Sequence, residues 1–400
     1  MVSNETVVVF RWIFSTYFES GPSARSLAPC FDQPNYKATW KITVHHPADM
    51  IALSNMPEEG FTIQPNGWAT SYFPTTPIMS SYLIAVAAGH FASLQTVSKT
   101  GVLVRTWAWT GMERYAETAL RTAAGQVDFM STYFKFPYML PKLDVLALPQ
   151  YTTMHGAEEH WGFIHILYRY MLADKAYATA DDYAYIASIT SHETVHQKLE
   201  RFLKAYSGFI TDSSTRTSKP VVPDKPLYFT GIPYNKGATL LYMMSQALGA
   251  PVFQEGLQTY LQAYQYKNVI PSNMFTHLTE VAFTLFIFVV VIFGSYSRID
   301  RNYGMTVDHE LATYPVLKET VDNDNNVVYS QEPFIKNTSA LQTSTYGWVW
   351  NIPVHSQMQG KPGRVLNYFV GKDGGSNALW KRTFDGNWQV DNAALGVCHL

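Results

Sequence analysis

Short runs of alternating apolar and polar residues make up the chain from about Val7 to Ser98. Turn residues such as Pro, Gly and Asn separate these runs at intervals of roughly 8 to 12 residues. The run Ala38–Val44 is one example. Alternation with a period of two places one side of each strand in a core and the other side in water. The pattern therefore predicts short strands in an antiparallel β-sandwich.

A longer period begins near Met112. Apolar residues then recur at a spacing that lies on one face of a helix, at Leu120, Ala124, Val127, Met130 and Phe134. The apolar run Leu143–Leu148 follows and predicts a strand. Helical patterns continue to about Phe283, and turns with alternating strands return after about Arg301.

Three more helices are predicted in the helical region, at Tyr185–Ser207, Lys236–Leu248 and Pro251–Tyr266. The segment Gly208–Pro226 is rich in Ser, Thr, Pro and Asp, which is typical of a loop. The apolar run Val281–Gly294 is shorter than the about 20 residues that a membrane-spanning helix needs, so a buried segment is expected there.

Composition narrows the class of protein. The chain has 400 residues, 47% of them hydrophobic, which is enough for more than one domain. The formal net charge is −2 with the charges scattered, so neither nucleic acid nor an anionic membrane is expected as a partner. The two cysteines, Cys30 and Cys398, are too few for a disulfide framework or a cysteine-built zinc site. Met1–Phe10 lacks the pattern of a signal peptide, and the localisation stays open.

The pentapeptide His192-Glu193-Thr194-Val195-His196 carries the first chemical signal. On a helix, the i, i+4 spacing places His192 and His196 on one face, where both imidazoles can bind one Zn²⁺. Zinc lowers the pKa of its bound water toward about 7, and Glu193 would accept the proton as that water attacks a peptide carbonyl. Two surface histidines without a metal would give the same pattern, so the pentapeptide alone leaves both interpretations open.

An acidic heptapeptide, Gly156–Gly162, precedes this pentapeptide by about thirty residues. Its sequence is Gly-Ala-Glu-Glu-His-Trp-Gly, which could place a carboxylate near the charged α-amino group of a substrate. A solvated acidic loop is the alternative.

The heptapeptide resembles the Gly-Ala-Met-Glu-Asn-Trp-Gly signature of the zinc aminopeptidases typified by aminopeptidase N. Five other stretches are similar to the same gluzincin family, at Pro29–Ala38, Ala52–Pro57, Thr76–Leu83, Leu140–Pro149 and Tyr234–Ala238. The resemblance runs along nearly the whole chain. It implies a metallopeptidase that hydrolyses N-terminal residues from peptides.

The resemblance also implies the roles of individual residues. One Zn²⁺ per chain would be held by His192 and His196, with Glu193 as general base. Tyr234 would donate a hydrogen bond to the developing oxyanion, although a packed tyrosine near a helix start is the alternative from the residue alone. Glu159 would bind the free N-terminal amine. The other substrate-binding positions carried over are Gly156, Ala157 and His160.

The third zinc ligand of the family is not identified in this chain. The family places a glutamate on the next helix, and the same spacing from His196 lands on Thr215. No glutamate lies between Glu200 and Glu255. Glu200 and Asp212 are the nearest substitutes, and a site with two histidines should bind zinc more weakly.

Other positions also depart from the family signature. Glu158 and His160 stand where the family has methionine and asparagine, and Tyr17 stands where a substrate-contacting glutamine is expected. We expect the added carboxylate of Glu158 to disturb Glu159 by like-charge repulsion.

The predicted fold class is α+β with several domains. Residues 1–98 would form an incomplete N-terminal antiparallel β-sandwich. Residues 99–296 would form a thermolysin-like, mainly helical catalytic domain with an internal deletion, and residues 297–400 part of a C-terminal β-sandwich. Relative to the family, the chain is expected to begin partway through the first β-domain and to end within the second.

Three hypotheses about function follow. The first is a zinc-dependent aminopeptidase with a peptide substrate, inactive if the third ligand is truly missing. The second is a non-catalytic homologue that binds peptides or a protein partner. The third is a shortened product without a stable fold. Membrane association is expected only through an anchor in a longer parent protein, and the residue preference and the oligomeric state stay open.

Overall fold

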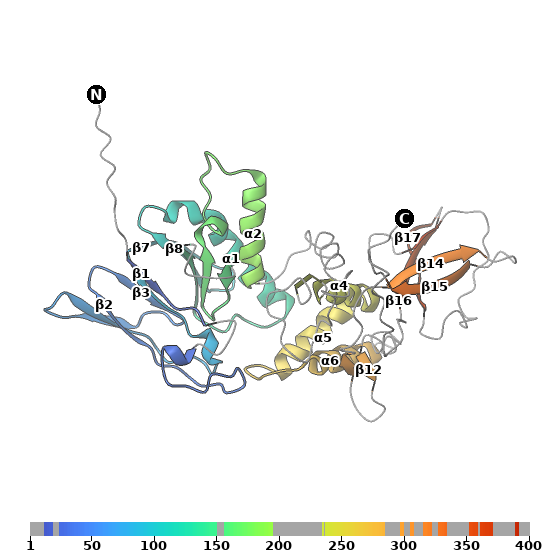
Figure 1. The fold of residues 1–400 in the computed structure, drawn as a ribbon, viewed down its shortest axis with the longest axis horizontal. Helices are drawn as coiled ribbons and strands as arrows, with labels where there is room; N and C mark the ends of the chain where they lie inside the picture. Colours follow the sequence, from blue (N-terminus) through green and yellow to red (C-terminus); the bar gives the residue numbers. More distant parts are fainter. Residues whose placement is uncertain are drawn as a thin grey trace, which may run out of the picture. The chain divides into compact units, whose positions relative to one another are not determined.

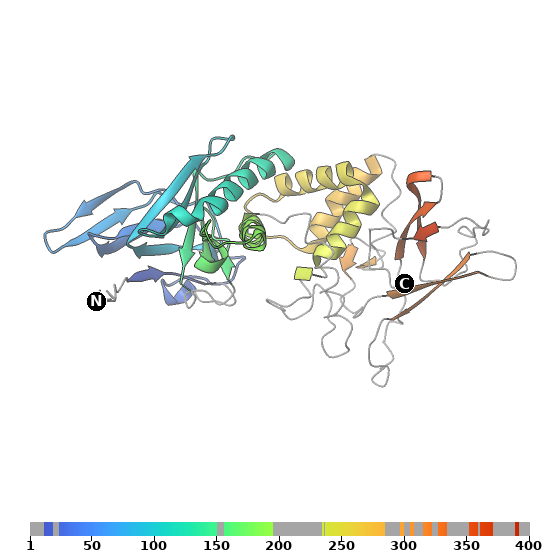
Figure 2. The same ribbon diagram turned by 90° about the horizontal axis from the view of Figure 1, so that it is seen from above.

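The computed structural model describes residues 12–18, 24–149, 156–194, 234–235 and 237–284, together with the strands between residues 297 and 391. The chain divides into two compact units (Figures 1 and 2). The first contains Met1–Gln197 and Tyr266–Asn268, and the second contains Lys198–Gln265 and Val269–Leu400.

Two three-stranded antiparallel sheets begin the first unit. One has the order β1 (Ile13–Ser15), β6 (Val86–Gly89) and β3 (Ile51–Ser54). The other has the order β2 (Thr43–Pro47), β5 (Trp68–Tyr72) and β4 (Gly60–Ile63). The predicted antiparallel strands in this part of the chain are therefore confirmed.

The strand predicted at Ala38–Val44 is placed too early. Strand β2 begins at Thr43, and Ala38 forms only an isolated bridge with Met79. The backbone between them bonds irregularly to a loop, because the N–H of Trp40 donates to the hydroxyl of Thr76 at 3.0 Å. Apolar residues can alternate along such a segment without making a regular ladder.

A five-stranded mixed sheet follows, with the order β10-β11-β9-β8-β7. Its strands are β7 (Phe91–Val97), β8 (Leu103–Trp109), β9 (Lys142–Leu148), β10 (Ala157–Glu158) and β11 (Phe163–Leu167). The central pairs β8/β9 and β9/β11 are parallel, whereas the two outer pairs are antiparallel. The strand predicted at Leu143–Leu148 is confirmed as β9, which is buried at every position.

Both faces of this sheet are covered, which explains why its central strands read as continuous apolar runs. On one face lie the helices α1 (Glu117–Tyr133) and α2 (Ala180–Thr194), packed over Val104, Val145 and Ile166. On the other face, residues of β3 and β6 pack against Leu146, Leu148 and Phe163. The predicted helix around Leu120 and Val127 is confirmed, with both residues buried. Figure 2 shows α2 nearly end-on.

Helix α2 begins at Ala180, five residues before the predicted start at Tyr185. A capping box sets this start. The backbone N–H and the hydroxyl of Thr179 donate to the Asp182 carboxylate at 2.8 and 2.7 Å, and the N–H of Asp182 donates back to the Thr179 hydroxyl at 3.2 Å. The predicted part of this helix beyond Thr194 lies outside the described residues.

The second unit contains three helices, α4 (Gly237–Leu248), α5 (Ala250–Ala263) and α6 (Pro271–Thr284). They share an apolar core that includes Met244, Val252 and Leu278. Helices α4 and α5 confirm two predictions, although α5 ends three residues before Tyr266. Val281 and Ala282 are buried as expected, and residues 285–296 lie outside the described part. No described helix is long and apolar enough to cross a lipid bilayer.

Strands return after the helices, as predicted. The pairs are β12 (Ser297–Ile299) with β13 (Met305–Val307), β14 (Pro315–Val321) with β15 (Val327–Pro333), and β16 (Ile352–Met358) with both β17 (Lys361–Val370) and β18 (Gln389–Asp391). All these pairs are antiparallel. Their assembly into a β-sandwich stays a prediction. Four 3₁₀ helices complete the described elements, η1 (Ala24–Ser26), η2 (Ser81–Leu83), η3 (Glu113–Ala116) and η4 (Tyr168–Tyr170).

Candidate active site

The acidic heptapeptide forms the edge of the five-stranded sheet. It is bounded by Gly156 and Gly162, whose φ angles of +98° and +72° lie in the region that favours glycine. A Cβ atom on Gly162 would lie 2.4 Å from the backbone oxygen of Asn55, so this position admits no side chain without a backbone shift. Between the two glycines, β10 pairs with β11 in antiparallel register. The sheet and the two turns therefore fix the path of the heptapeptide.

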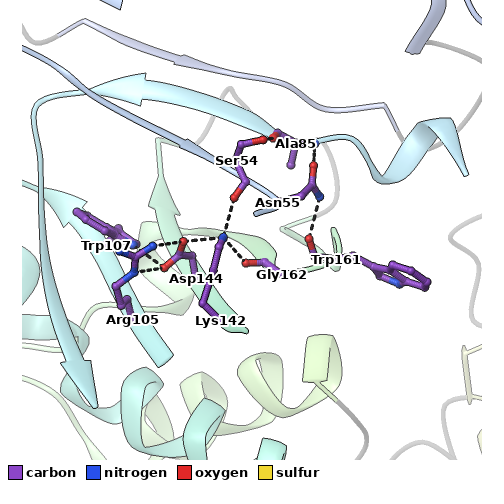
Figure 3. A network of polar contacts seen from close by, with 9 residues as sticks. All are labelled: Ser54, Asn55, Ala85, Arg105, Trp107, Lys142, Asp144, Trp161 and Gly162. Carbon is purple, nitrogen blue, oxygen red and sulfur yellow. Dashed lines mark hydrogen bonds and ion pairs between the residues drawn. The ribbon is translucent and has the colours of Figure 1, made fainter. Parts of the chain in front are cut away.

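A buried lysine holds the second end of the heptapeptide (Figure 3). The Nζ of Lys142 donates to the carbonyl oxygens of Ser54 and Gly162 at 2.6 and 2.8 Å. Its third partner is the Asp144 carboxylate at 2.7 Å. All three donors of the ammonium group are thus used. Lys142 thereby joins the end of β3, strand β9 and the heptapeptide.

Asn55 makes a second connection beside Lys142 (Figure 3). Its Nδ2 donates to the carbonyl oxygens of Trp161 and Leu83, both at 2.8 Å. Its Oδ1 accepts from the N–H of Ala85 at 2.9 Å. The last two residues of the heptapeptide are therefore tied to the N-terminal sheets by side chains that the sequence interpretation did not assign.

Asp144 balances the charge of Lys142. Its carboxylate accepts from Arg105 Nε and Nη2 at 2.6 and 2.8 Å and from Trp107 Nε1 at 2.9 Å. Burial alone would raise the pKa of Asp144, but the positive charges of Lys142 and Arg105 outweigh it and hold that pKa below its usual value. Burial lowers the pKa of Lys142, and Asp144 opposes that shift. Lys142 and Asp144 are buried, and the two cations Lys142 and Arg105 share this one carboxylate.

The side chains of the heptapeptide alternate between two environments. Ala157 packs against the core under α1 and α2, whereas Glu158 is 1% exposed on the other side of β10. Glu159 is exposed, and His160 is again 1% exposed. Glu159 directly follows β10, the strand that α2 contacts.

Glu158 is buried whereas Glu159 is exposed, and the expected like-charge repulsion between them stays a prediction. The Oε1 of Glu158 lies 3.2 Å from Nε2 of His160, and both side chains are buried. The two residues that depart from the family signature thus pair with each other. His160, expected among the substrate-binding residues, lies in this buried pair and not on the exposed side that carries Glu159.

His192 and Glu193 lie in the last described turn of α2, and both are half-buried. A half-buried imidazole on this helix fits a zinc ligand. His196, Thr215 and the suggested substitutes Glu200 and Asp212 lie outside the described residues. Across the ranges that the structure describes, no group of three or more His, Cys, Asp or Glu side chains is arranged to hold a metal ion.

Tyr234 belongs to the second unit. It stands three residues before α4 and is 39% exposed. Its role as an oxyanion donor stays a prediction, as do the roles of Gly156 and Ala157.

The burial of Lys142 could have been predicted from the sequence. Lys142 and Asp144 stand two residues apart at the start of an apolar strand, so they share one face of a strand that is otherwise apolar. Charged residues are almost never fully buried unless they are paired. Their spacing therefore indicates an internal ion pair, although it does not identify the carbonyl oxygens that the lysine also binds.

His165 provides a pH-dependent prediction. Burial lowers its pKa well below 6.5, and the charge of His160 lowers it further. The unfolded chain binds a proton near pH 6.5, whereas the folded chain does not. The free energy of unfolding should therefore fall as the pH drops below about 6.5, by up to about 1.4 kcal/mol per pH unit from this residue.

Urea unfolding at several pH values between 7 and 5 measures this effect. His165→Leu should flatten the pH dependence relative to the unchanged chain. His45→Leu, which removes an exposed imidazole, is the matched control variant. Equal slopes for the unchanged chain and His165→Leu would contradict the prediction.

Comparison with known families identifies the class of protein. The profile of the peptidase M1 N-terminal domain matches residues 6–83, and that of the peptidase family M1 domain matches residues 118–199 and 204–291. Together these stretches cover more than half of the chain. The class that they define is that of the peptidases. Within it, the chain belongs to the M1 family, which confirms the resemblance found in the motifs.

Curated relatives agree with this family. "Putative aminopeptidase-2" of Caenorhabditis elegans is 38% identical, over 96% of this chain and 22% of the relative. "Thyrotropin-releasing hormone-degrading ectoenzyme" of Homo sapiens is 29% identical, over 88% of this chain and 38% of the relative. "Aminopeptidase N" of Bos taurus is 26% identical, over 95% of this chain and 44% of the relative. The chain spans less than half of the length of these relatives.

Proposed function

We propose that this chain carries the active site of a zinc-dependent aminopeptidase, which removes N-terminal residues from peptides. The observation that carries the proposal is the contact between α2 and β10 within one unit. Helix α2 bears His192 and Glu193, and the heptapeptide that contains β10 bears the exposed Glu159. A metal ligand, a proton acceptor and an amine-binding carboxylate thus belong to two elements in contact.

Each residue has a proposed role. His192 and His196 would hold the zinc ion, which when bound would polarise a water molecule for attack on the peptide carbonyl. Glu193 accepts the proton of that water, because a carboxylate next to the metal ligand on a helix lies beside the open coordination position. Tyr234 donates to the oxyanion. Glu159 binds the α-amino group of the substrate through a charge-assisted hydrogen bond.

The heptapeptide contributes more than Glu159. We assign Gly156 and Ala157 to the substrate-binding edge, since β10 is the outer strand of its sheet and an extended peptide can pair with such a strand. His160 keeps its place in this set only through its backbone, because its side chain is buried.

The domain organisation completes the proposal. Residues 1–98 form the N-terminal β-domain, residues 99–296 a thermolysin-like catalytic domain that lacks an internal segment, and residues 297–400 part of a second β-sandwich. The alignment with the Caenorhabditis elegans relative supports the missing segment. It extends over 432 residues, more than the 400 of this chain, so that relative contains residues with no counterpart here.

A second candidate function is peptide binding without catalysis. It is favoured by Thr215, which stands at the family spacing for the third zinc ligand. A chain of this kind would bind peptides with a free amine in the presence of a chelator. The aminopeptidase loses hydrolysis when the metal is removed, so the two candidates differ in their response to a chelator.

Glu159→Gln tests the amine-binding role that both candidates share. Binding of a short unblocked peptide should weaken about 10- to 100-fold, which corresponds to the loss of a charge-assisted hydrogen bond. Binding of the N-acetylated form of the same peptide should be unchanged. Isothermal titration calorimetry measures the affinity for each of the two peptides. Glu58→Gln removes an exposed carboxylate elsewhere and is the matched control. An equal loss for both peptides would contradict the assignment.

A further inference from the structure

The buried carboxylate of Glu158 lies next to two histidines. Nε2 of His160 is 3.2 Å from Oε1 of Glu158. His165 is the direct partner of Glu158 in the antiparallel pairing of β10 with β11. The centroids of the two imidazole rings are 4.8 Å apart. All three side chains are at most 1% exposed.

Within the described part of the chain, Glu158 and His160 are each other's polar partners. Neither oxygen of Glu158 and neither ring nitrogen of His160 has a hydrogen bond to another residue in the described part of the chain. A single charge in this position would be buried without compensation, which is strongly unfavourable. Each of the two side chains is therefore the other's nearest polar partner in the described part of the chain.

The other nearby groups cannot replace His160. The ammonium group of Lys142 already has three acceptors, the carbonyls of Ser54 and Gly162 and the carboxylate of Asp144. Burial and the charge of His160 lower the pKa of His165 well below 6.5, so His165 is neutral near pH 7. Of the two rings next to Glu158, His160 is the one whose nitrogen lies within ion-pair distance of the carboxylate.

We propose that Glu158 and His160 are positioning residues, whose buried ion pair holds Glu158 on the inner side of β10 and thereby fixes Glu159 on the outer side. The inference rests on the proposed role of Glu159 in amine binding. It goes beyond that role because it assigns a task to two residues that do not contact the substrate through their side chains.

The pairing explains why two departures from the family signature occur together. Methionine and asparagine at these positions would be neutral, and glutamate with histidine is neutral as a pair. Either replacement alone would leave a buried charge without a partner. Such a charge would pull its side chain toward water and would thereby move the adjacent Glu159 from its exposed position.

Carboxyl labelling of the full chain tests the proposal without any need for activity. A water-soluble carbodiimide with glycinamide labels exposed carboxylates, and mass spectrometry of peptides gives the rate at each one. In the unchanged chain, Glu159 should react about tenfold faster than Glu158. In His160→Asn, Glu158 should become reactive and this ratio should fall to about one.

Rescue variants separate positioning from general stability. In the double variant Glu158→Met with His160→Asn, Glu159 should recover the rate that it has in the unchanged chain, to within about twofold. Glu158→Gln keeps the shape of the side chain but removes the charge that His160 faces, so the rate at Glu159 should fall as it does in His160→Asn, and this milder variant serves if His160→Asn unfolds. Glu58→Met is the matched control and should change neither rate.

Two results would overturn the proposal. One is a labelling ratio in His160→Asn that equals the ratio in the unchanged chain. The other is a double variant in which Glu159 does not recover. Calorimetry with unblocked and N-acetylated peptides is a separate measurement. If the unchanged chain does not distinguish the two peptides, the amine-binding function fails, while the labelling ratios still decide whether the pair positions Glu159.

Discussion

Replacement of Glu193 by glutamine is expected to lower the rate of hydrolysis of an aminoacyl fluorogenic substrate by about 100- to 10,000-fold. Glutamine has the same shape as glutamate but cannot accept the proton of the attacking water at neutral pH. Glu193 lies half-buried in the last described turn of α2, so the exchange should leave the helix intact. The loss should appear in kcat, because the proton transfer occurs in the chemical step.

Asp181 provides a control on the same helix. It is exposed in the first turn of α2, and Asp181→Asn should keep kcat within about twofold. Circular dichroism and thermal melts of both variants establish that they are folded. If Glu193→Gln hydrolyses the substrate as fast as the unchanged chain, Glu193 is not the general base.

Replacement of Lys142 by methionine is expected to lower the free energy of unfolding by about 3 kcal/mol. Methionine fills a similar volume but leaves the carbonyl oxygens of Ser54 and Gly162 without their donor. It also removes one of the two positive charges that compensate Asp144. Arg105 still pairs with Asp144, which places the expected loss at the lower end of the range for a broken buried ion pair.

Urea unfolding at pH 7 measures this loss, with Lys41→Met as the matched control. Lys41 is exposed, and its replacement should change the free energy of unfolding by less than about 0.5 kcal/mol. Hydrogen exchange should also become faster at the amides next to Gly162, because the end of the heptapeptide loses one of its ties. A stability equal to that of the unchanged chain would show that the contacts of Lys142 contribute nothing to the fold.

The elements that could be predicted from the sequence are those whose packing leaves a clear period. Helix α1 has one buried face, and β9 is apolar along its whole length because both of its sides are covered. Strand β11 was not predicted. Its five residues, Phe163–Leu167, are all buried, and so short a run has no period that separates a strand from a helix.

Local hydrogen bonds explain the errors at boundaries. The start of α2 depends on the reciprocal bonds of Thr179 and Asp182, which precede the apolar pattern of the helix. The pair Thr-x-x-Asp is a visible signal in the sequence, whereas the apolar spacing alone predicts a start only at Tyr185. The displaced start of β2 has a different cause, since it depends on contacts with a loop more than thirty residues later.

The residues of the candidate site could be predicted from the sequence, but the directions of their side chains could not. The motifs identify Glu159, His192 and Glu193 from their residue types and spacing. The environment of each heptapeptide carboxylate depends on the neighbouring strand and on His160. The adjacent residues Glu158 and Glu159 are both acidic, yet Glu158 is buried and Glu159 is exposed. The role of Asn55 depends on carbonyl oxygens from distant segments, which no local pattern reveals.

The zinc content of the purified full chain, measured by plasma mass spectrometry alongside chelator-sensitive hydrolysis of an aminoacyl substrate, tests the aminopeptidase proposal most directly. The account predicts one zinc ion per chain, with hydrolysis that disappears with a chelator and in Glu193→Gln. A folded chain that contains no zinc and hydrolyses no aminoacyl substrate would contradict the account, and would leave a homologue that binds peptides without cleaving them.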